Sequence, residues 1–202
     1  MAVISISRQY GAGGVSVGEM VASRLGYRMV DEAVLTEVAQ QANIAVQWVK
    51  EADRSAGDRL ARLVPKILAH REFVRYLPGT TTKLDEKLYR QFLRIVIAKL
   101  GEEGRVVILG RGSQFILKDN PQAVRVMLRA EEKDRIASLQ KRYGVSREKA
   151  ATIAQIAENN RLNFLRGFKA GAPDDPQHYH LVINTSLVSH ERAADMICLL
   201  VE

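Results

Sequence analysis

Short apolar runs that alternate with helical patterns constrain the fold of this chain more than any other feature. The runs are continuous rather than interleaved with polar residues, which is typical of strands buried on both faces of a sheet. Because helical segments separate them, the strands are expected to run parallel and to be joined by crossovers. We therefore predict a doubly wound α/β fold with helices on both faces of a five-stranded parallel sheet. The predicted strands cover residues 3–6, 27–30, 105–109, 123–128 and 179–183.

Glycine and serine residues indicate where the helices begin and end. Gly26, Gly101 and Gly144 each follow a helical pattern and are placed to end it. Ser146 and Ser189 precede helical patterns and are predicted to be N-caps. The region from 32 to 100 is predicted to be largely helical, most clearly over 86–100.

Length and composition favour a single globular domain. The chain has 202 residues, of which 47% are hydrophobic and 26% are charged. We predict one domain over 1–202, with a helical, lid-like insertion at about 40–100. Cys198 is the only cysteine, which excludes an intramolecular disulfide. The sequence has no apolar stretch of the roughly 18 residues that a membrane span requires, so we expect a cytoplasmic protein.

The net charge of +7 is concentrated in one part of the chain. Residues 50–99 contain 12 Lys or Arg against 6 Asp or Glu, and such a surface favours anionic partners. A solvated helical face, a phosphate-facing lid and a nucleic-acid surface are the alternatives. Nucleic acid is the least favoured, because no recognised nucleic-acid-binding module is present. The cations that a lid would turn toward phosphate are Arg54, Arg59, Arg62, Arg71, Arg75 and Lys83.

A glycine-rich turn follows the first predicted strand and precedes a helix. Glycines allow backbone N–H groups to turn inward around a phosphate, and the helix N-terminus adds positive potential. A tight turn without a ligand is the structural alternative. The residues predicted to cradle phosphate are Gly11, Ala12, Gly13, Gly14, Val15 and Ser16.

This turn departs from the usual P-loop of Gly, four residues, Gly, Lys and Ser or Thr. If Gly13 is the second glycine, Arg8 stands at the first, Gly14 at the lysine and Val15 at the hydroxyl position. The lysine neutralises charge on a transferred phosphoryl group, so its absence matters for catalysis. Arg8 is the nearest candidate to supply that charge, and Ser16 is the best available hydroxyl for a metal ion.

Four segments together resemble one family, the cytidylate kinase-like proteins, a divergent group of nucleoside monophosphate kinases in the P-loop NTPase superfamily. The resemblance runs in order over most of the chain and is weakest across 40–100. The segments are Ile4-Ser5-Ile6-Ser7-Arg8-Gln9-Tyr10-Gly11-Ala12-Gly13-Gly14, Ile108-Leu109-Gly110-Arg111-Gly112, Glu158-Asn159-Asn160-Arg161-Leu162-Asn163-Phe164 and Leu181-Val182-Ile183-Asn184-Thr185.

The resemblance implies a P-loop-type fold and a kinase that moves the γ-phosphate of ATP, with Mg²⁺, to a nucleoside monophosphate or a similar small phosphorylated acceptor. It implies that Arg111 holds the acceptor phosphate and that Glu158 and Arg161 read the acceptor base and phosphate. Asp31 matches an acceptor-binding Asp after the second strand. Arg135 matches the first lid arginine, and with Arg8 it would neutralise the moving phosphoryl group. Ser16 would hold the metal ion.

Three departures from the family pattern motivate an alternative function. Gly112 stands where the family has Asp, and Glu32 and Glu37 stand where a Ser and an Arg contact the acceptor. With the missing lysine, these changes indicate a non-catalytic nucleotide-binding protein of the same fold as the alternative. Binding without transfer would distinguish it from a kinase. The sequence is compatible with a monomer or a homodimer.

Overall fold

The structure is a computed structural model that describes residues 1–31 and 86–201. Most of the predicted helical insertion, and with it Glu32, Glu37 and the predicted lid cations, lies outside the described residues.

The described residues form one five-stranded parallel sheet, as predicted. Its order is β2-β3-β1-β4-β5, so β1 lies in the centre between β3 and β4. The chain therefore reverses its direction of winding at β1, which is where open α/β sheets bind ligands, beyond the carboxyl ends of the strands. The strands are β1 Val3–Arg8, β2 Arg28–Val30, β3 Val106–Leu109, β4 Ala123–Arg129 and β5 Leu181–Asn184.

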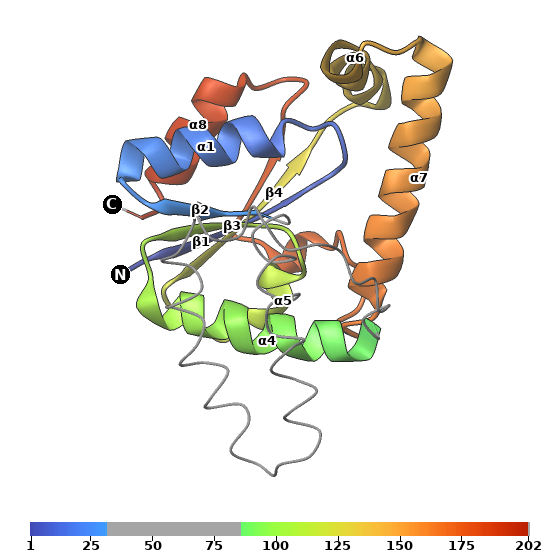
Figure 1. Cartoon of the computed structure of the whole chain (residues 1–202). Coiled ribbons are helices and arrows are strands. Elements are labelled where there is room, and N and C mark those ends of the chain that lie inside the picture. The colour runs from blue at the N-terminus through green and yellow to red at the C-terminus, as the bar shows by residue number, and fades with distance from the viewer. Residues whose placement is uncertain (32–85, 202) are drawn as a thin grey trace, which may run out of the picture.

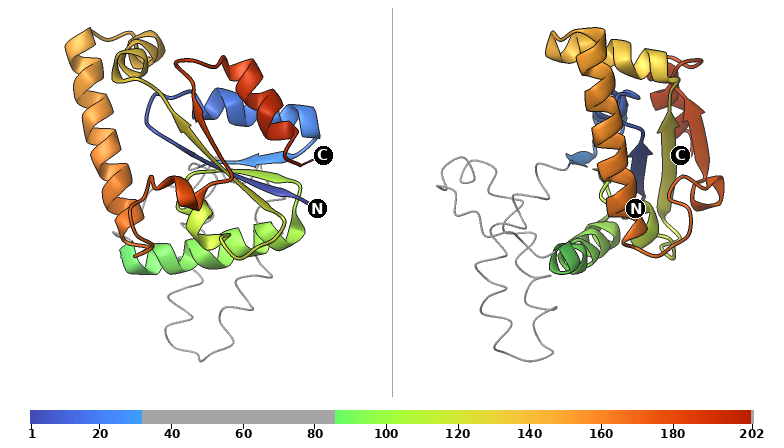
Figure 2. Two further views of the ribbon diagram at one scale, coloured as in Figure 1. Left: turned by 180° about the vertical axis from the view of Figure 1, so that it is seen from behind. Right: turned by 90° about the vertical axis from the view of Figure 1, so that its right-hand side faces the viewer.

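Helices cover both faces of the sheet. Two of them, α1 and α8, pack on one face, and α4 and α5 pack on the other (Figure 1). The α6–α7 pair stands beyond the carboxyl ends of the strands, as Figure 2 shows from two further directions. The helices are α1 Gly14–Leu25, α4 Glu86–Glu103, α5 Ser113–Ile116, α6 Glu132–Tyr143, α7 Arg147–Arg166 and α8 His190–Cys198.

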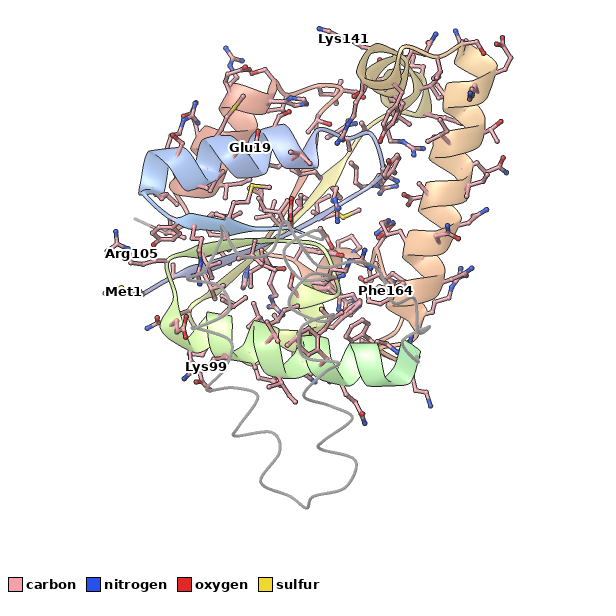
Figure 3. The ribbon with its side chains drawn as sticks, viewed as in Figure 1. Met1, Glu19, Lys99, Arg105, Lys141 and Phe164 are labelled. Atoms are coloured by element: carbon pink, nitrogen blue, oxygen red, sulfur yellow. The ribbon has the colours of Figure 1, made fainter. Side chains whose placement is uncertain are left out.

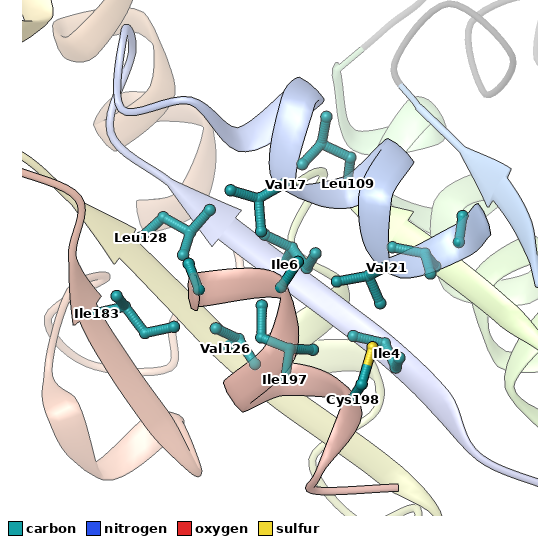
Figure 4. Close-up of a cluster of buried hydrophobic side chains, with 14 residues drawn as sticks. Ile4, Ile6, Val17, Val21, Leu109, Val126, Leu128, Ile183, Ile197 and Cys198 are labelled. Atoms are coloured by element: carbon teal, nitrogen blue, oxygen red, sulfur yellow. The ribbon is translucent and has the colours of Figure 1, made fainter. Parts of the chain in front are cut away.

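Two apolar cores explain why the strands are continuously hydrophobic. On one face, side chains of β1 and β4 pack against α1 and α8, and Figure 4 shows Ile4, Ile6, Val17, Val21 and Ile197 in this cluster. On the other face, β1 and β3 pack against the buried stripe of α4. That stripe consists of Phe92, Leu93, Val96, Ile97 and Leu100. Each central strand thus buries alternate side chains in opposite cores.

The predicted helix caps are largely confirmed. Gly26 and Gly144 end α1 and α6 in the left-handed conformation, with φ of 63° at both. Ser146 Oγ accepts the N–H of Lys149 at the start of α7, and Ser189 caps α8 in the same way. These side chains satisfy N–H groups that the first helical turn leaves without a carbonyl partner.

The prediction that Gly101 ends its helix is wrong. Helix α4 continues to Glu103, and Gly104 follows it with a φ of 69°. Gly101 instead lies in close packing, because a Cβ there would lie 2.5 Å from Leu117 Cδ2. A glycine inside a helix costs about 1 kcal/mol relative to alanine, and here it permits close contact between α4 and the segment after α5.

The last strand begins two residues later than predicted. Pro176–His178 forms a short 3-10 helix, and the Tyr179 hydroxyl donates to the carbonyl of Pro173 at 2.9 Å. The pairing with β4 starts at Leu181, opposite Val126. Across the described part of the chain, no helix combines the length and apolarity needed to cross a bilayer.

Candidate active site

The glycine-rich turn leads from β1 into α1. Gly11 and Gly13 adopt left-handed φ values of 90° and 77°, and Gly13 is the N-cap of α1 without a side chain to cap it. The first N–H groups of a 12-residue helix therefore face a position that no capping side chain fills. Backbone donors and a helix N-terminus in this arrangement suit an anion such as phosphate.

Residues from three other segments of the chain contact this turn closely. Thr185 Oγ1 donates to the carbonyl of Ala12 at 3.2 Å. A Cβ at Gly13 would collide with the ring of His190, and a Cβ at Gly11 would lie 2.8 Å from the carbonyl oxygen of Arg135. Thr185 belonged to a family segment, but nothing in the sequence pointed to His190, which the fold brings from the start of α8.

Arg8 explains why glycine occupies the lysine position. Arg8 is the last residue of β1, and a Cβ at Gly14 would lie 2.6 Å from Arg8 Cγ. The Arg8 side chain passes on toward Gly110, where a Cβ would collide with its Nη1. Burial, and then the charge of Arg161, lower the pKa of Arg8, while the carboxylates of Asp31 and Glu158 oppose that shift.

A second glycine-containing turn follows β3 and presents Arg111. Gly110, Arg111 and Gly112 have successive φ values of 76°, 56° and 73°. A non-glycine residue in this region is strained by roughly 1–2 kcal/mol. The guanidinium carbon of Arg111 lies 5.4 Å from the ring centroid of Phe164. Burial, and then the charge of Arg8, lower the pKa of Arg111 to about 10.

A cavity of about 290 Å³ opens between these turns and α7. One stripe of α7 lines it, because residues 157, 160, 161, 164 and 165 recur at helical spacing. Figure 3 shows Phe164 on the side of α7 that faces the sheet. The wall combines apolar and cationic side chains. It is lined by Ser7, Arg8, Tyr10, Gly110, Arg111, Ala157, Asn160, Arg161, Phe164 and Leu165.

Two carboxylates hold Arg161 at the cavity wall. Its Nη1 and Nη2 donate to Asp174 at 2.9 and 2.7 Å, and Nη2 also donates to Glu158 Oε1 at 2.6 Å. Burial lowers the pKa of Arg161, but the hydrogen bonds with Asp174 and Glu158 outweigh it, so the net shift is upward. Asp174 lies in the segment before β5 and belongs to no motif, so the sequence did not predict it.

The fold brings five of the twelve predicted site residues together at the cavity. Arg8, Arg111 and Arg161 line one cavity, and Glu158 is bonded to Arg161 beside it. The charge of Asp31, directly after β2, acts on Arg8.

Arg135 and residues 11–16 lie apart from this cavity, at the glycine-rich turn. Arg135 Nη1 donates to the Tyr10 carbonyl at 3.5 Å, and its Nε is buried without a hydrogen-bond partner among the described residues. Ser16 is exposed in the first turn of α1. The described residues thus contain two adjoining positions, one lined by backbone donors and one by arginines.

Comparison with solved structures supports the architecture. A protein of uncharacterized function from Eubacterium ventriosum superimposes with a TM-score of 0.68 and 19% identity, over 100% of this chain and 98% of that one. A gluconokinase from Sinorhizobium meliloti superimposes with a TM-score of 0.52 and 16% identity, over 98% and 92%. At these identities the likeness concerns the fold alone.

Sequence comparison assigns the family. The search of curated proteins gave no significant match. The sequence profile of the Cytidylate kinase-like family, in contrast, matches residues 3–187, which include both glycine-containing turns, α7 and β5. The chain therefore belongs to the cytidylate kinase-like family.

Proposed function

We propose that this protein is a kinase that transfers the γ-phosphate of ATP to a nucleoside monophosphate or a similar small phosphorylated acceptor. One observation carries the proposal: Arg8, Arg111 and Arg161 line a single cavity beside a glycine-rich helix N-terminus. Catalysis of phosphoryl transfer is mostly positioning and charge neutralisation, and this arrangement suits both.

The donor phosphates would lie on residues 11–16. No side chain caps the N-terminus of α1, so its first backbone N–H groups would donate to these phosphates. Ser16 would hold Mg²⁺, which neutralises charge on the donor phosphates when it is bound. Ser16 is exposed in the first turn of α1, which supports that assignment.

The acceptor would bind at the cavity, with Arg111 and Arg161 at its phosphate and Asp31 and Glu158 at its edge. An oxygen of that phosphate attacks the γ-phosphorus, the bond from the γ-phosphorus to the bridging oxygen breaks, and ADP leaves. Arg8 would take the place of the P-loop lysine, because its side chain covers Gly14 and reaches Gly110 between the two positions. Arg135 would add charge from the start of α6.

A coupled assay of ADP release over a panel of nucleoside monophosphates, with ATP and Mg²⁺, tests the proposal. We expect turnover with at least one acceptor and its loss in R111A. No turnover with any acceptor, in protein shown to be folded by circular dichroism, would contradict a kinase function.

The alternative function is nucleotide binding without transfer, which the glycines at positions 14 and 112 favour. It predicts that calorimetry detects ATP binding while the coupled assay detects no turnover. Binding that survives the double substitution R111A/R161A would favour this alternative further, because the acceptor arginines would then have no role toward the donor.

The basic segment 50–99 is assigned to the small-molecule site rather than to nucleic acid. Only its part from residue 86 onward, in α4, is described. Gel-shift titration at low and moderate salt tests the assignment, because nucleic-acid binding weakens steeply as salt rises. Sub-micromolar binding with that salt dependence would contradict it.

A further inference from the structure

The carboxylate of Glu158 is engaged on both oxygens. Its Oε1 accepts from Arg161 Nη2 at 2.6 Å and from Nε at 3.2 Å. Its Oε2 accepts from Arg161 Nε and from the backbone N–H of Tyr10, both at 3.2 Å. The Glu158 side chain is only 16% exposed. A carboxylate committed in this way has little freedom to read an acceptor base.

These bonds join two parts of the site that are distant in sequence. Tyr10 belongs to the glycine-rich turn and lines the cavity from there, whereas Arg161 lines it from α7. Asp174 holds Arg161 from its other side at 2.7 Å. A continuous series of hydrogen bonds therefore runs from the Tyr10 N–H through Glu158 and Arg161 to Asp174.

We propose that Glu158 is a positioning residue that couples the glycine-rich turn to the arginine-lined cavity. The proposal rests on the proposed function in one respect, namely that the turn holds the donor and the cavity holds the acceptor. It assigns Glu158 a task other than base recognition, which the family resemblance implied.

The missing lysine gives this coupling its importance. A P-loop lysine reaches from the helix that holds the donor toward the transferred phosphate, and Gly14 has no side chain with which to do so. The position of the turn relative to the cavity must be set by other contacts. A carboxylate that accepts a backbone N–H makes a charge-assisted hydrogen bond, which is stronger than a neutral one.

Tyr10 makes further contacts with helices α6 and α7. Its side chain packs against a cluster of Ile136, Leu139, Ala150 and Ala154 between α6 and α7. Its carbonyl accepts from Arg135 Nη1 in α6. Tyr10 thus attaches the glycine-rich turn to both α6 and α7, and Glu158 in α7 accepts its backbone N–H.

Glu158→Asp is the decisive variant, because it keeps the charge but shortens the side chain by one C–C bond, about 1.5 Å. An aspartate can remain paired with Arg161 but cannot also reach the Tyr10 N–H. Asp174→Asn weakens the bonds between Arg161 and residue 174 but keeps the hydrogen bond from the Tyr10 N–H to Glu158. Glu148→Gln is the matched control, since Glu148 lies in the first turn of α7, exposed and away from the cavity.

Each variant is characterised by two measurements. They are amide hydrogen exchange of Tyr10 by NMR in the free protein and the Kd of ATP by calorimetry. We expect E158D to exchange its Tyr10 amide about tenfold faster and to bind ATP about tenfold more weakly, as expected for loss of one hydrogen bond to a charged group. D174N and E148Q should leave both values within about twofold of the wild type.

Unchanged Tyr10 exchange in E158D would overturn the coupling. Equal acceleration in E158D and D174N would overturn it as well, because Glu158 would then only stabilise α7. Wild-type protein that binds no ATP would refute the proposed function alone, and the exchange of the Tyr10 amide would still decide whether Glu158 positions the turn.

Discussion

The turn after β1 and the turn after β3 are both rich in glycine, but they present different chemical groups to a ligand. Both contain left-handed glycines, both lie beside an arginine that lines the cavity, and both open a helix at the same edge of the sheet. The first turn spans five residues between Arg8 and Gly14 and opens a helix of 12 residues. The second has three residues between β3 and a helix of four.

The difference lies in which groups each turn presents. Residues 9–13 lead into the N-terminus of a long helix, whose first backbone N–H groups have no side-chain cap and whose dipole favours an anion. At Gly110, Arg111 and Gly112 the chain turns too tightly for this, so the turn presents one side chain at the cavity. Backbone donors suit a phosphate chain held lengthwise, and a guanidinium suits a single terminal phosphate.

The largest effect is expected at Arg111, whose replacement removes the group that the second turn presents. R111A and R111G should both lower kcat/KM for the acceptor by about 10²- to 10³-fold, the usual loss for one charge-stabilising donor. R111G should nevertheless have a free energy of unfolding about 1 kcal/mol higher than R111A, because glycine accepts a φ of 56° without strain. Coupled assays and urea denaturation measure the two quantities.

Arg147→Ala serves as the control for loss of a cation, since Arg147 is exposed at the start of α7. If R111G were less stable than R111A, the left-handed backbone would not be a source of strain. If both variants kept full activity, the second turn would present nothing that the reaction needs.

The first turn can be changed toward the usual P-loop. G14K alone should lower activity about 100-fold, because its Cβ would meet Arg8 Cγ at 2.6 Å. R8G alone should lose a similar factor, through loss of charge. The double variant R8G/G14K removes the collision and restores the P-loop lysine, so we expect it to be at least tenfold more active than either single variant.

Coupled assays at saturating ATP measure this non-additivity. Strictly additive losses in the double variant would show that Arg8 does not stand in for the lysine, and the two turns would then differ less than we infer.

A smaller effect is expected from a methyl group at Gly13. G13A should weaken ATP binding about tenfold, through the strain of alanine at a φ of 77° and a collision with the His190 ring. H190A removes the collision but not the strain, so G13A/H190A should recover part of the affinity, about threefold. Calorimetry measures all three proteins. Full recovery of ATP affinity would show that the contact with His190 alone requires glycine at position 13. No recovery would show that the left-handed backbone alone requires it.

The sequence predicted the sheet and four of the five residues named as helix ends, because these depend on local patterns, whereas Arg111 and Arg161 were named from the family resemblance. Apolar runs specify strands, and serine or glycine at helix ends specifies caps whatever the distant contacts are. Gly101 was misread because a packing glycine and a cap glycine look alike in sequence. Its true role depends on Leu117, which the fold brings close.

Asp174 and His190 could not be predicted for a related reason. Asp174 meets Arg161 only because the segment before β5 returns to the lower part of α7, and His190 meets Gly13 only because α8 packs beside α1. A single carboxylate or imidazole has no spacing that would mark it in advance. Arg8 was identified from its place in the motif, but its path over Gly14 is a property of the fold.

The smallest effect concerns the Tyr10 and Tyr143 hydroxyls, which lie 2.8 Å apart and tie the first turn to the end of α6. Y10F, Y143F and the double variant should each lower the free energy of unfolding by no more than about 1 kcal/mol, with the double no worse than either single, because one hydrogen bond is lost in all three.

Burial, and then the Tyr143 hydrogen bond, raise the pKa of Tyr10. The native state therefore keeps this proton at a pH where the unfolded chain releases it. The contribution of the Tyr10 hydroxyl to the free energy of unfolding is full below pH about 10 and is lost as pH rises through the native pKa. The free energy of unfolding of Y10F should therefore fall less steeply at alkaline pH than that of the wild type. Urea denaturation from pH 7 to 11 measures it, and a wild-type profile no steeper than that of Y10F would show that the hydroxyl pair does not hold the turn to α6.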